Sequence, residues 1–527
     1  MGGVGFRPAQ LCKREGLEER FLGYREKSGS LRWRHKRQDS DLSTVTGNYR
    51  NIAYSLIAVS ELTITLNSIM RVIQALARYF PDKCGGIQVN LSELIPQLQY
   101  QNVEIKIAAA KVEVDKENTY QLNDVEVYRY PISSKPKPQP NHGQFAHQGF
   151  KCFAKWLSSQ KANIYHQHHW EVTCGLPHLR LAKQLGMNTI VTVHYPIPIC
   201  QRTTLMFNGQ EACDGKIDII RCSRCTDGLS KKLPNQILKN LSRLPISAIS
   251  RIPLPVSAYL PTSVNEAKGR FIRPFVIPAY VAARQYSLHE MVKYADRIIV
   301  VCDWLYKSLL VNGVPEEKLI LCRYGISYAT SNQFTNNQSI RTSNNSKEHV
   351  LKVAYLGRWD VSKGIDILVQ AVKNLPPDIN INLVIHAINQ DERYRKNVIE
   401  IINDDTRIRI SKQLTREELP SVLASYDLLA VPSQWLETGP LVVLESHSVG
   451  VPVIGSNLGG ISELVRHGVD GWLVSANDPK AWSQALMKLA CDTELLKKLR
   501  QGIKPVRTIT EQATELKQIY QNIYQQR

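Results

Sequence analysis

The sequence has no hydrophobic run long enough to form a transmembrane helix. The nearest candidate, residues 52–66, falls short of the roughly 18 uncharged apolar residues that a membrane span needs and contains Glu61. The amino terminus also lacks the order of a basic stretch followed by an apolar one that marks a secretory signal. We therefore expect a cytoplasmic protein.

Acidic residues are scarce: 47 Asp and Glu stand against 66 Lys and Arg, a formal net charge of +19. The imbalance is strongest between residues 229 and 285, where Glu266 is the one acid. The basic residues of this segment are Lys231, Lys232, Lys239, Arg243, Arg251, Lys268, Arg270, Arg273 and Arg284. Nucleic acid, an anionic membrane face and a polyanionic substrate each remain explanations for this charge.

The eleven cysteines are an odd number in a large chain without a signal, which favours reduced thiols or metal ligands over disulfides. Four of them, Cys200, Cys213, Cys222 and Cys225, are separated by 12, 8 and 2 residues. This spacing fits a tetrahedral structural zinc site that would hold a loop without a core of its own. Free thiols and a disulfide are the alternatives.

A chain of 527 residues predicts two or three domains. Residues 1–69 show no sustained strand or helix period, and we interpret them as a basic extension that is either upstream of the folded core or a small regulatory segment. From Met70 to Ile326 apolar strands alternate with helical stretches, which indicates a doubly wound parallel sheet with a Cys-rich and basic insertion at about 200–285. Residues 327–350 are rich in Ser, Asn and Thr and are predicted to be a linker. A second domain then spans 351–505, and a terminal helix spans 506–527.

Two acids eight residues apart, Glu437 and Glu445, follow a buried strand ending near Ser433. Strand, loop and helix place them at the carboxyl end of the sheet, where open α/β sheets bind ligands. Pro440 is predicted to start the helix. The backbone N–H groups of Gly439 and of the first helical turn, including Leu441, favour a phosphate, and the two carboxylates can accept hydrogen bonds from sugar or ribose hydroxyls. An isolated pair of glutamates at this spacing would more often lie on a solvated surface.

Two further loops have the chemistry of a phosphate site. Arg358 and Lys363 lie on a strand-to-helix loop, where two cations can hold a diphosphate and offset the charge of a departing group. Gly85 and Gly86 follow the first strand of the first domain and leave room for a phosphate to approach the backbone.

The pattern formed by Gly85-Gly86, Arg358, Lys363 and the two glutamates resembles that of family 4 of the retaining glycosyltransferases, the group 1 glycosyl transferases. The resemblance covers about residues 70–510 and implies the GT-B fold, in which two Rossmann-like domains face each other across a cleft. It implies sugar transfer, without a catalytic metal or cofactor, from a nucleoside-diphosphate sugar to a glycan or lipid-linked acceptor, in polysaccharide or glycolipid assembly.

The resemblance also implies a role for each residue. Arg358 and Lys363 would hold the diphosphate, Glu445 the ribose and Glu437 the sugar hydroxyls, while Gly85-Gly86 would close over the phosphates. The strand that ends in His166-Gln167-His168 puts His168 beside the donor sugar, and His194 is a weaker candidate. Lone histidines are otherwise most often structural.

Two departures from the family pattern affect these expectations. The family usually has an aromatic residue and a glycine where this chain has Gly439 and Pro440, so a packing group and a backbone donor are absent. Residues 385–389 replace a glycine-rich loop beside the base, so the choice of nucleotide is open. A nucleotide-sugar epimerase on the same fold and a non-enzymatic, zinc-containing nucleic-acid binder are the rival functions. Nucleic acid is the less favoured partner; an anionic membrane surface is the alternative explanation of the charge.

Overall fold

The computed structural model describes residues 69–82, 85–133, 144–245, 273–327 and 350–526, together with two short paired strands, β1 (Tyr24–Arg25) and β2 (Leu31–Arg32). The chain divides into two compact units, Met1–Ser68 and Ile69–Arg527. The boundary coincides with the change of pattern expected at Met70. Most of the predicted linker lies outside the described residues.

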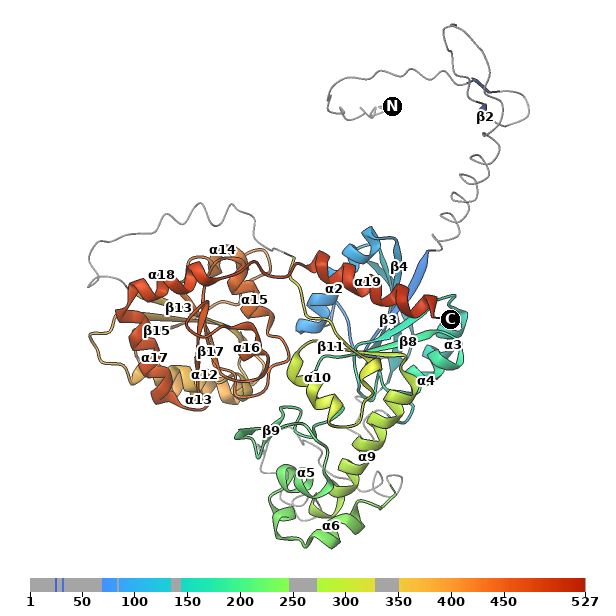
Figure 1. Ribbon diagram of the computed structural model, residues 1–527, viewed down its shortest axis with the longest axis horizontal. Helices are drawn as coiled ribbons and strands as arrows, with labels where there is room; N and C mark the ends of the chain where they lie inside the picture. The colour runs from blue at the N-terminus through green and yellow to red at the C-terminus, as the bar shows by residue number, and fades with distance from the viewer. Residues whose placement is uncertain are drawn as a thin grey trace, which may run out of the picture. The chain divides into compact units, whose positions relative to one another are not determined.

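The second unit contains two parallel sheets, each covered by helices (Figure 1). The first sheet has the order β12-β11-β8-β7-β3-β4-β6-β5, in which β5 alone runs antiparallel to its neighbour. Its strands are β3 (Met70–Leu76), β4 (Val103–Val112), β5 (Asn118–Leu122), β6 (Val125–Ile132), β7 (Ile164–Gln167), β8 (Asn188–Val193), β11 (Arg297–Val300) and β12 (Leu319–Leu321). The order reverses between β3 and β7, and this switch point is where an open α/β sheet binds its ligand.

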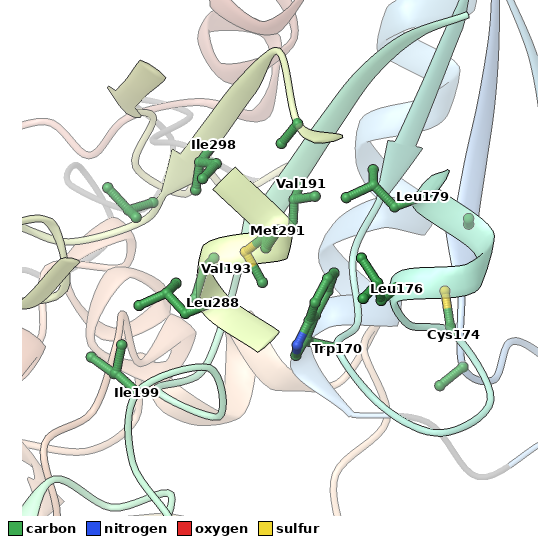
Figure 2. Close-up of a cluster of buried hydrophobic side chains, with 14 of the residues drawn as sticks. Trp170, Cys174, Leu176, Leu179, Val191, Val193, Ile199, Leu288, Met291 and Ile298 are labelled. Atoms are coloured by element: carbon green, nitrogen blue, oxygen red, sulfur yellow. The ribbon is translucent and has the colours of Figure 1, made fainter. Parts of the chain in front are cut away.

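The helices of the first domain cover both faces of this sheet. They are α2 (Gly86–Tyr100), α3 (Phe150–Ser159), α4 (Leu176–Gln184), α9 (Arg273–Tyr294) and α10 (Asp303–Leu310). Figure 2 shows the core on one face, where Val191 and Val193 of β8 meet Leu176 of α4 and Met291 of α9. Each fully buried aliphatic side chain of this kind contributes on the order of 2 kcal/mol to folding, so the packing holds the strand ends in place.

Between β8 and α9 the chain leaves the sheet to form the insertion predicted from its cysteines and basic residues (Figure 1). Its described elements are β9 (Met206–Phe207), β10 (Glu211–Ala212), α5 (Ile219–Thr226), the 3-10 turn η1 (Leu229–Lys232) and α6 (Asn235–Leu241). Helices α5 and α6 pack on α9.

The second sheet has the order β15-β14-β13-β16-β17-β18 and is parallel throughout. Its strands are β13 (Leu351–Arg358), β14 (Ile381–Ile388), β15 (Ile408–Ser411), β16 (Leu428–Val431), β17 (Val453–Ser456) and β18 (Gly471–Val474). Its helices are α12 (Ile365–Lys373), α13 (Glu392–Ile402), α14 (Leu419–Leu423), α15 (Leu441–Ser448), α16 (Gly459–Leu464), α17 (Pro479–Cys491) and α18 (Thr493–Gly502). Its switch point lies between β13 and β16, the two strands that precede the candidate residues.

The terminal helix α19 (Ile509–Gln525) returns to the first domain and packs on α2 (Figure 1). Asn90 of α2 and Gln512 of α19 exchange amide hydrogen bonds of 3.1 and 3.2 Å in a buried contact. Among the described residues, no helix is long and apolar enough to cross a membrane.

Candidate functional site

The predicted cation Lys363 and the predicted carboxylate Glu437 form an ion pair of 2.5 Å. Lys363 comes from the turn after β13 and Glu437 from the loop after β16, so the switch point of the second sheet brings them together. Ser433 and Trp435 also donate hydrogen bonds to Oε1 of Glu437, each 2.8 Å long. The ammonium group of Lys363 lies 5.4 Å from the centre of the Trp435 ring, within cation–π range.

All three donors bind the same carboxylate oxygen of Glu437. Among the described residues, Oε2 of Glu437 accepts no hydrogen bond, although the residue as a whole is buried. A fixed, charged acceptor with an unused oxygen is what recognition of a hydroxyl requires.

The predicted glycine pair and the predicted phosphate-binding helix meet across the two domains. A side-chain carbon added at Gly86 would lie 3.7 Å from Cδ1 of Leu441, so the amino termini of α2 and α15 are neighbours. Each helix terminus carries a partial positive charge and unpaired N–H groups. Two such termini side by side form a site for an anion such as a diphosphate. Pro440 is the cap of α15 and not its first residue, a shift of one position from the prediction.

Arg358 ends β13 with an exposed side chain, and no described residue forms an ion pair with it. Its charge acts across the domains on Tyr195, which follows β8: burial raises the pKa of Tyr195, and Arg358 is the strongest influence that opposes this rise. Glu437 acts on the same phenol and raises its pKa. Arg358 and Glu437 therefore both lie close enough to Tyr195 for their charges to act on its hydroxyl.

Glu445, the predicted ribose ligand, is buried in α15 and is paired with Arg416. The same guanidinium pairs with Glu93 of α2, in the first domain. Arg416 was not predicted. Arg416 therefore links Glu445 of the second domain to α2, the helix whose amino terminus lies beside Leu441.

Both ring nitrogens of His168 are hydrogen-bonded to buried protein groups. Nε2 lies 2.6 Å from Oε1 of Gln74, and Nδ1 lies 3.0 Å from Nε2 of His194, whose Nδ1 is 2.5 Å from the Tyr324 hydroxyl. Because Gln74 Oε1 can only accept, Nε2 of His168 carries the proton and Nδ1 accepts from His194. Burial, followed by the neighbouring His169, lowers the pKa of His168 to about 3, so the ring is neutral.

His168 thus lies at the predicted strand end but offers no unoccupied nitrogen to a sugar. The adjacent His169 is also buried, and its Nδ1 has no hydrogen-bond partner among the described residues. The strand pattern predicts that histidines lie at this strand end. Only the structure shows which ring nitrogens are hydrogen-bonded and which are not.

Tyr324 of the first domain takes the place of the aromatic residue that the family pattern has at position 439. A carbon added at Gly439 would lie 3.0 Å from Cδ2 of Tyr324, so the phenol ring already fills that space. The packing group expected to be absent is supplied from another part of the chain. The two residues also line a small pocket between the domains.

The four cysteines of the insertion are not arranged as a metal site. All are free, so they form no disulfide. Cys225 accepts a hydrogen bond from the Asn208 backbone, and the Cys213 thiol lies beside the Arg221 guanidinium. In the described parts of the chain, no group of three His, Cys, Asp or Glu is placed to hold a metal ion. This geometry does not support zinc, which stays a prediction.

Comparisons with known proteins identify the family of the second domain and the fold of the chain. Residues 336–505 match the family model of glycosyl transferases group 1. The chain carries a group 1 glycosyltransferase domain. The chain spans only about a third to two fifths of the length of the first curated relatives that it matches.

One relative of the glycosyltransferase domain is the D-inositol 3-phosphate glycosyltransferase of Corynebacterium efficiens, 34% identical over 28% of this chain and 36% of the relative. Another is an uncharacterized 41.2 kDa protein in the cps region of Klebsiella pneumoniae, 25% identical over 36% of this chain and 50% of the relative.

The solved structures show the fold of both domains. The sucrose-phosphate synthase of Thermosynechococcus elongatus aligns with 87% of this chain and 100% of its own, with a TM-score of 0.58 and 14% identity. The catalytic domain of starch synthase IV from Arabidopsis thaliana aligns over the same shares with a TM-score of 0.53 and 13% identity. The predicted GT-B fold is confirmed.

Proposed function

We propose that this protein transfers a sugar, with retention of its anomeric configuration, from a nucleoside-diphosphate sugar to an acceptor hydroxyl, without a metal at the reaction centre. Arg358 and the amino termini of α2 and α15 hold the diphosphate. Glu445 binds the ribose, and Oε2 of Glu437 accepts from a sugar hydroxyl. Lys363 offsets the charge that grows on the diphosphate as it leaves.

The observation that carries this proposal is the ion pair between Lys363 and Glu437 beside the two helix termini. A cation fixed by a carboxylate, a ring and a short turn needs no reorganisation when negative charge develops nearby. When the donor enters, the ammonium group is shared between carboxylate and phosphate, which orients the sugar and the leaving group together.

The named relatives support this donor and suggest the setting. One relative is named as a glycosyltransferase acting on an inositol phosphate, and the starch synthase structure is described as bound to ADP. The Klebsiella relative is placed in a cps region. We propose that the acceptor is a glycan or a lipid-linked glycan of polysaccharide or glycolipid assembly.

Thermal unfolding with UDP, GDP, ADP and inorganic pyrophosphate tests the donor site. A nucleoside diphosphate at about 100 times its Kd should stabilise the fold by roughly 2.7 kcal/mol, and pyrophosphate, which lacks the ribose, should stabilise it less. The matching nucleotide sugar should then give an acceptor-dependent product with the anomeric configuration of the donor. No stabilisation by any of the nucleotides would contradict the proposal, and acceptor-independent isomerisation of the sugar would favour an epimerase.

A second part of the proposal concerns the location of the reaction. Four basic side chains of the insertion are exposed, Lys231, Lys232, Lys239 and Arg243. Ile237 and Leu244 are exposed beside them in the chain, whereas Leu238 is buried and anchors α6 to the core. We propose that this surface, the α6 face, holds the enzyme on anionic lipid at the inner face of a membrane.

A further inference from the structure

Helix α10 of the first domain is attached at its amino terminus to the donor loop of the second domain. The indole N–H of Trp304 donates to the backbone oxygen of Glu437 at 2.8 Å. The backbone N–H groups of Asp303 and Trp304 donate to the two carboxylate oxygens of Glu463, at 2.9 and 2.8 Å. A carboxylate from one domain thus caps a helix of the other, where it also complements the positive end of the helix.

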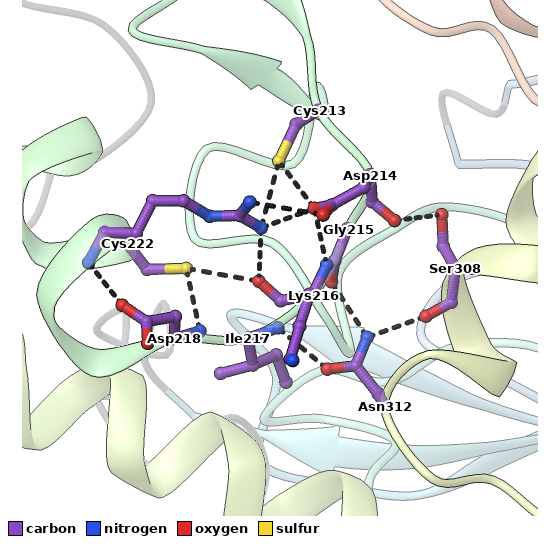
Figure 3. Close-up of polar contacts among 10 residues, drawn as sticks. Cys213, Asp214, Gly215, Lys216, Ile217, Asp218, Cys222, Ser308 and Asn312 are labelled. Carbon is purple, nitrogen blue, oxygen red and sulfur yellow. Dashed lines mark hydrogen bonds and ion pairs between the residues drawn. The ribbon is translucent and has the colours of Figure 1, made fainter.

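The other half of α10 holds the cysteine-bearing insertion (Figure 3). Asn312, two residues after the helix, uses both ends of its amide: it donates to the Gly215 oxygen and accepts from the Ile217 N–H, each at 2.8 Å. Ser308 donates to the Asp214 oxygen at 3.1 Å. The insertion is therefore docked on the same helix that contacts Glu437.

Close packing makes this docking specific. A side-chain carbon at Gly215 would lie 2.7 Å from Ser308, and Gly215 has a φ of +81°. Any other residue there would both clash with α10 and adopt a rare backbone conformation.

The insertion also reaches the donor loop directly. The Thr204 oxygen accepts from the Leu436 N–H at 3.2 Å, one residue before Glu437. Thr203 and Leu205, on either side of Thr204, have φ values of 59° and 50°, a region that non-glycine and especially β-branched residues avoid. Leu205 and Leu436 are buried in the same cluster. Strain of this kind persists where the surroundings hold it, and it is found at functional sites.

We propose that Asn312 is a positioning residue for the transfer reaction. By docking the insertion on α10, it holds Thr204, whose oxygen accepts from the donor loop just before Glu437, in register with Trp304 of α10, which donates to the same loop. The inference rests on the proposed function of Glu437. It follows that whatever binds the insertion, acceptor or membrane, acts on the geometry of the donor loop.

The test is Asn312→Ala, which removes both amide bonds to the insertion. Hydrogen exchange at the Leu436 amide should become faster, because its acceptor on Thr204 is no longer held. Turnover should fall by roughly 10-fold or more, since small misplacements of a catalytic loop are costly. Affinity for the nucleoside diphosphate identified by thermal unfolding should change by no more than about 2-fold, because the groups that hold the diphosphate are untouched.

Asn163→Ala is the matched control. The Asn163 side chain accepts from the Arg71 backbone N–H at 2.8 Å, the same kind of side-chain-to-backbone bond in the same domain, but just before the amino end of β7 and away from the site. If Asn312→Ala behaves like Asn163→Ala in both exchange and turnover, the inference is wrong. Ser308→Ala, which loses one bond to the insertion, gives a milder version of the same test if Asn312→Ala does not fold.

The exchange measurement separates the two proposals. A wild-type protein that transfers no sugar contradicts the proposed function. Faster exchange at Leu436 in Asn312→Ala would then still demonstrate the docking, but the docking would have no catalytic role. Normal transfer by the wild type with unchanged exchange and turnover in Asn312→Ala would leave the proposed function standing and overturn the inference alone.

Discussion

At the scale of single residues, the proposed donor site is organised by Glu437, whose side chain and backbone are held by different parts of the chain. Its carboxylate is bound by Lys363, Ser433 and Trp435, all from the second domain. Its backbone oxygen accepts from Trp304 of the first domain and from the Gly460 N–H. A buried acceptor that is fully paired on one side and unpaired on the other is oriented before any ligand arrives.

Lys363→Ala should lower turnover by roughly 10²-fold or more, because it removes the charge aimed at the departing diphosphate. The protein should still fold, since Ser433 and Trp435 continue to bind the Glu437 carboxylate. Steady-state kinetics and circular dichroism measure the two effects. Lys373→Ala is the control, because Lys373 lies at the far end of the following helix and donates to the Ile401 oxygen. Turnover unchanged by the loss of Lys363 would exclude its assigned role.

The sequence was sufficient to predict that Lys363 and Glu437 lie at the same edge of the second sheet, because each follows the end of a strand. It was not sufficient for Trp304 or Thr204, which contact the donor loop from 133 and about 230 residues away in the chain. The spacing of residues within one segment cannot predict a contact with a residue so far away in the chain. Tyr324 illustrates the same limit: the loss of an aromatic group was visible at position 439, but its replacement from another segment was not.

At the scale of elements, buried strands were the most predictable part of the fold. The apolar run that became β16, Leu428–Val431, is buried on both faces, so its continuous hydrophobicity marks it clearly. The antiparallel strand β5 was missed because its residues Asn118–Leu122 are polar and mostly exposed.

The α6 face gives a prediction for the insertion. Each cation near an anionic surface contributes about 1 kcal/mol, so the four exposed basic residues should bind anionic vesicles reversibly and more weakly at high salt. Arg284, counted with this charge in the sequence, is buried and donates to Gln201, so it does not contribute. Arg251, Lys268 and Arg270 lie outside the described residues.

Sedimentation with vesicles measures this binding. Replacement of Lys231, Lys232, Lys239 and Arg243 by Gln should abolish it, while replacement of Lys480, Lys488, Lys497 and Lys498 of the second domain should not. Equal binding to neutral and anionic vesicles, or binding to neither, would assign the charge to a soluble polyanionic acceptor.

At the scale of the whole molecule, buried neutral histidines join the donor site to the carboxyl-terminal helix. His194 and His168 are hydrogen-bonded in sequence between Tyr324 and Gln74, and Gln74 donates to the Tyr520 hydroxyl of α19 at 3.0 Å. His166 lies 2.8 Å from the same hydroxyl. Burial is the main cause that lowers the pKa of each of these histidines, so the network needs uncharged imidazole rings.

This requirement predicts how stability depends on pH. The pKa of His168 is about 3 in the folded protein and 6.5 when unperturbed, so the unfolded chain binds a proton between these values that the folded protein does not. Stability therefore increases with pH in this window, by about 1.4 kcal/mol per pH unit for one such histidine. The contribution of neutral His168 to the free energy of unfolding is complete above pH 6.5 and is lost as the pH falls toward 3. Urea unfolding between pH 6.5 and 5 measures the slope above the range in which carboxylates titrate. His168→Gln should reduce the slope, whereas His289→Gln, at an exposed position on α9, should leave it unchanged. A slope that is the same in both variants and the wild type would show that His168 is not buried as a neutral ring.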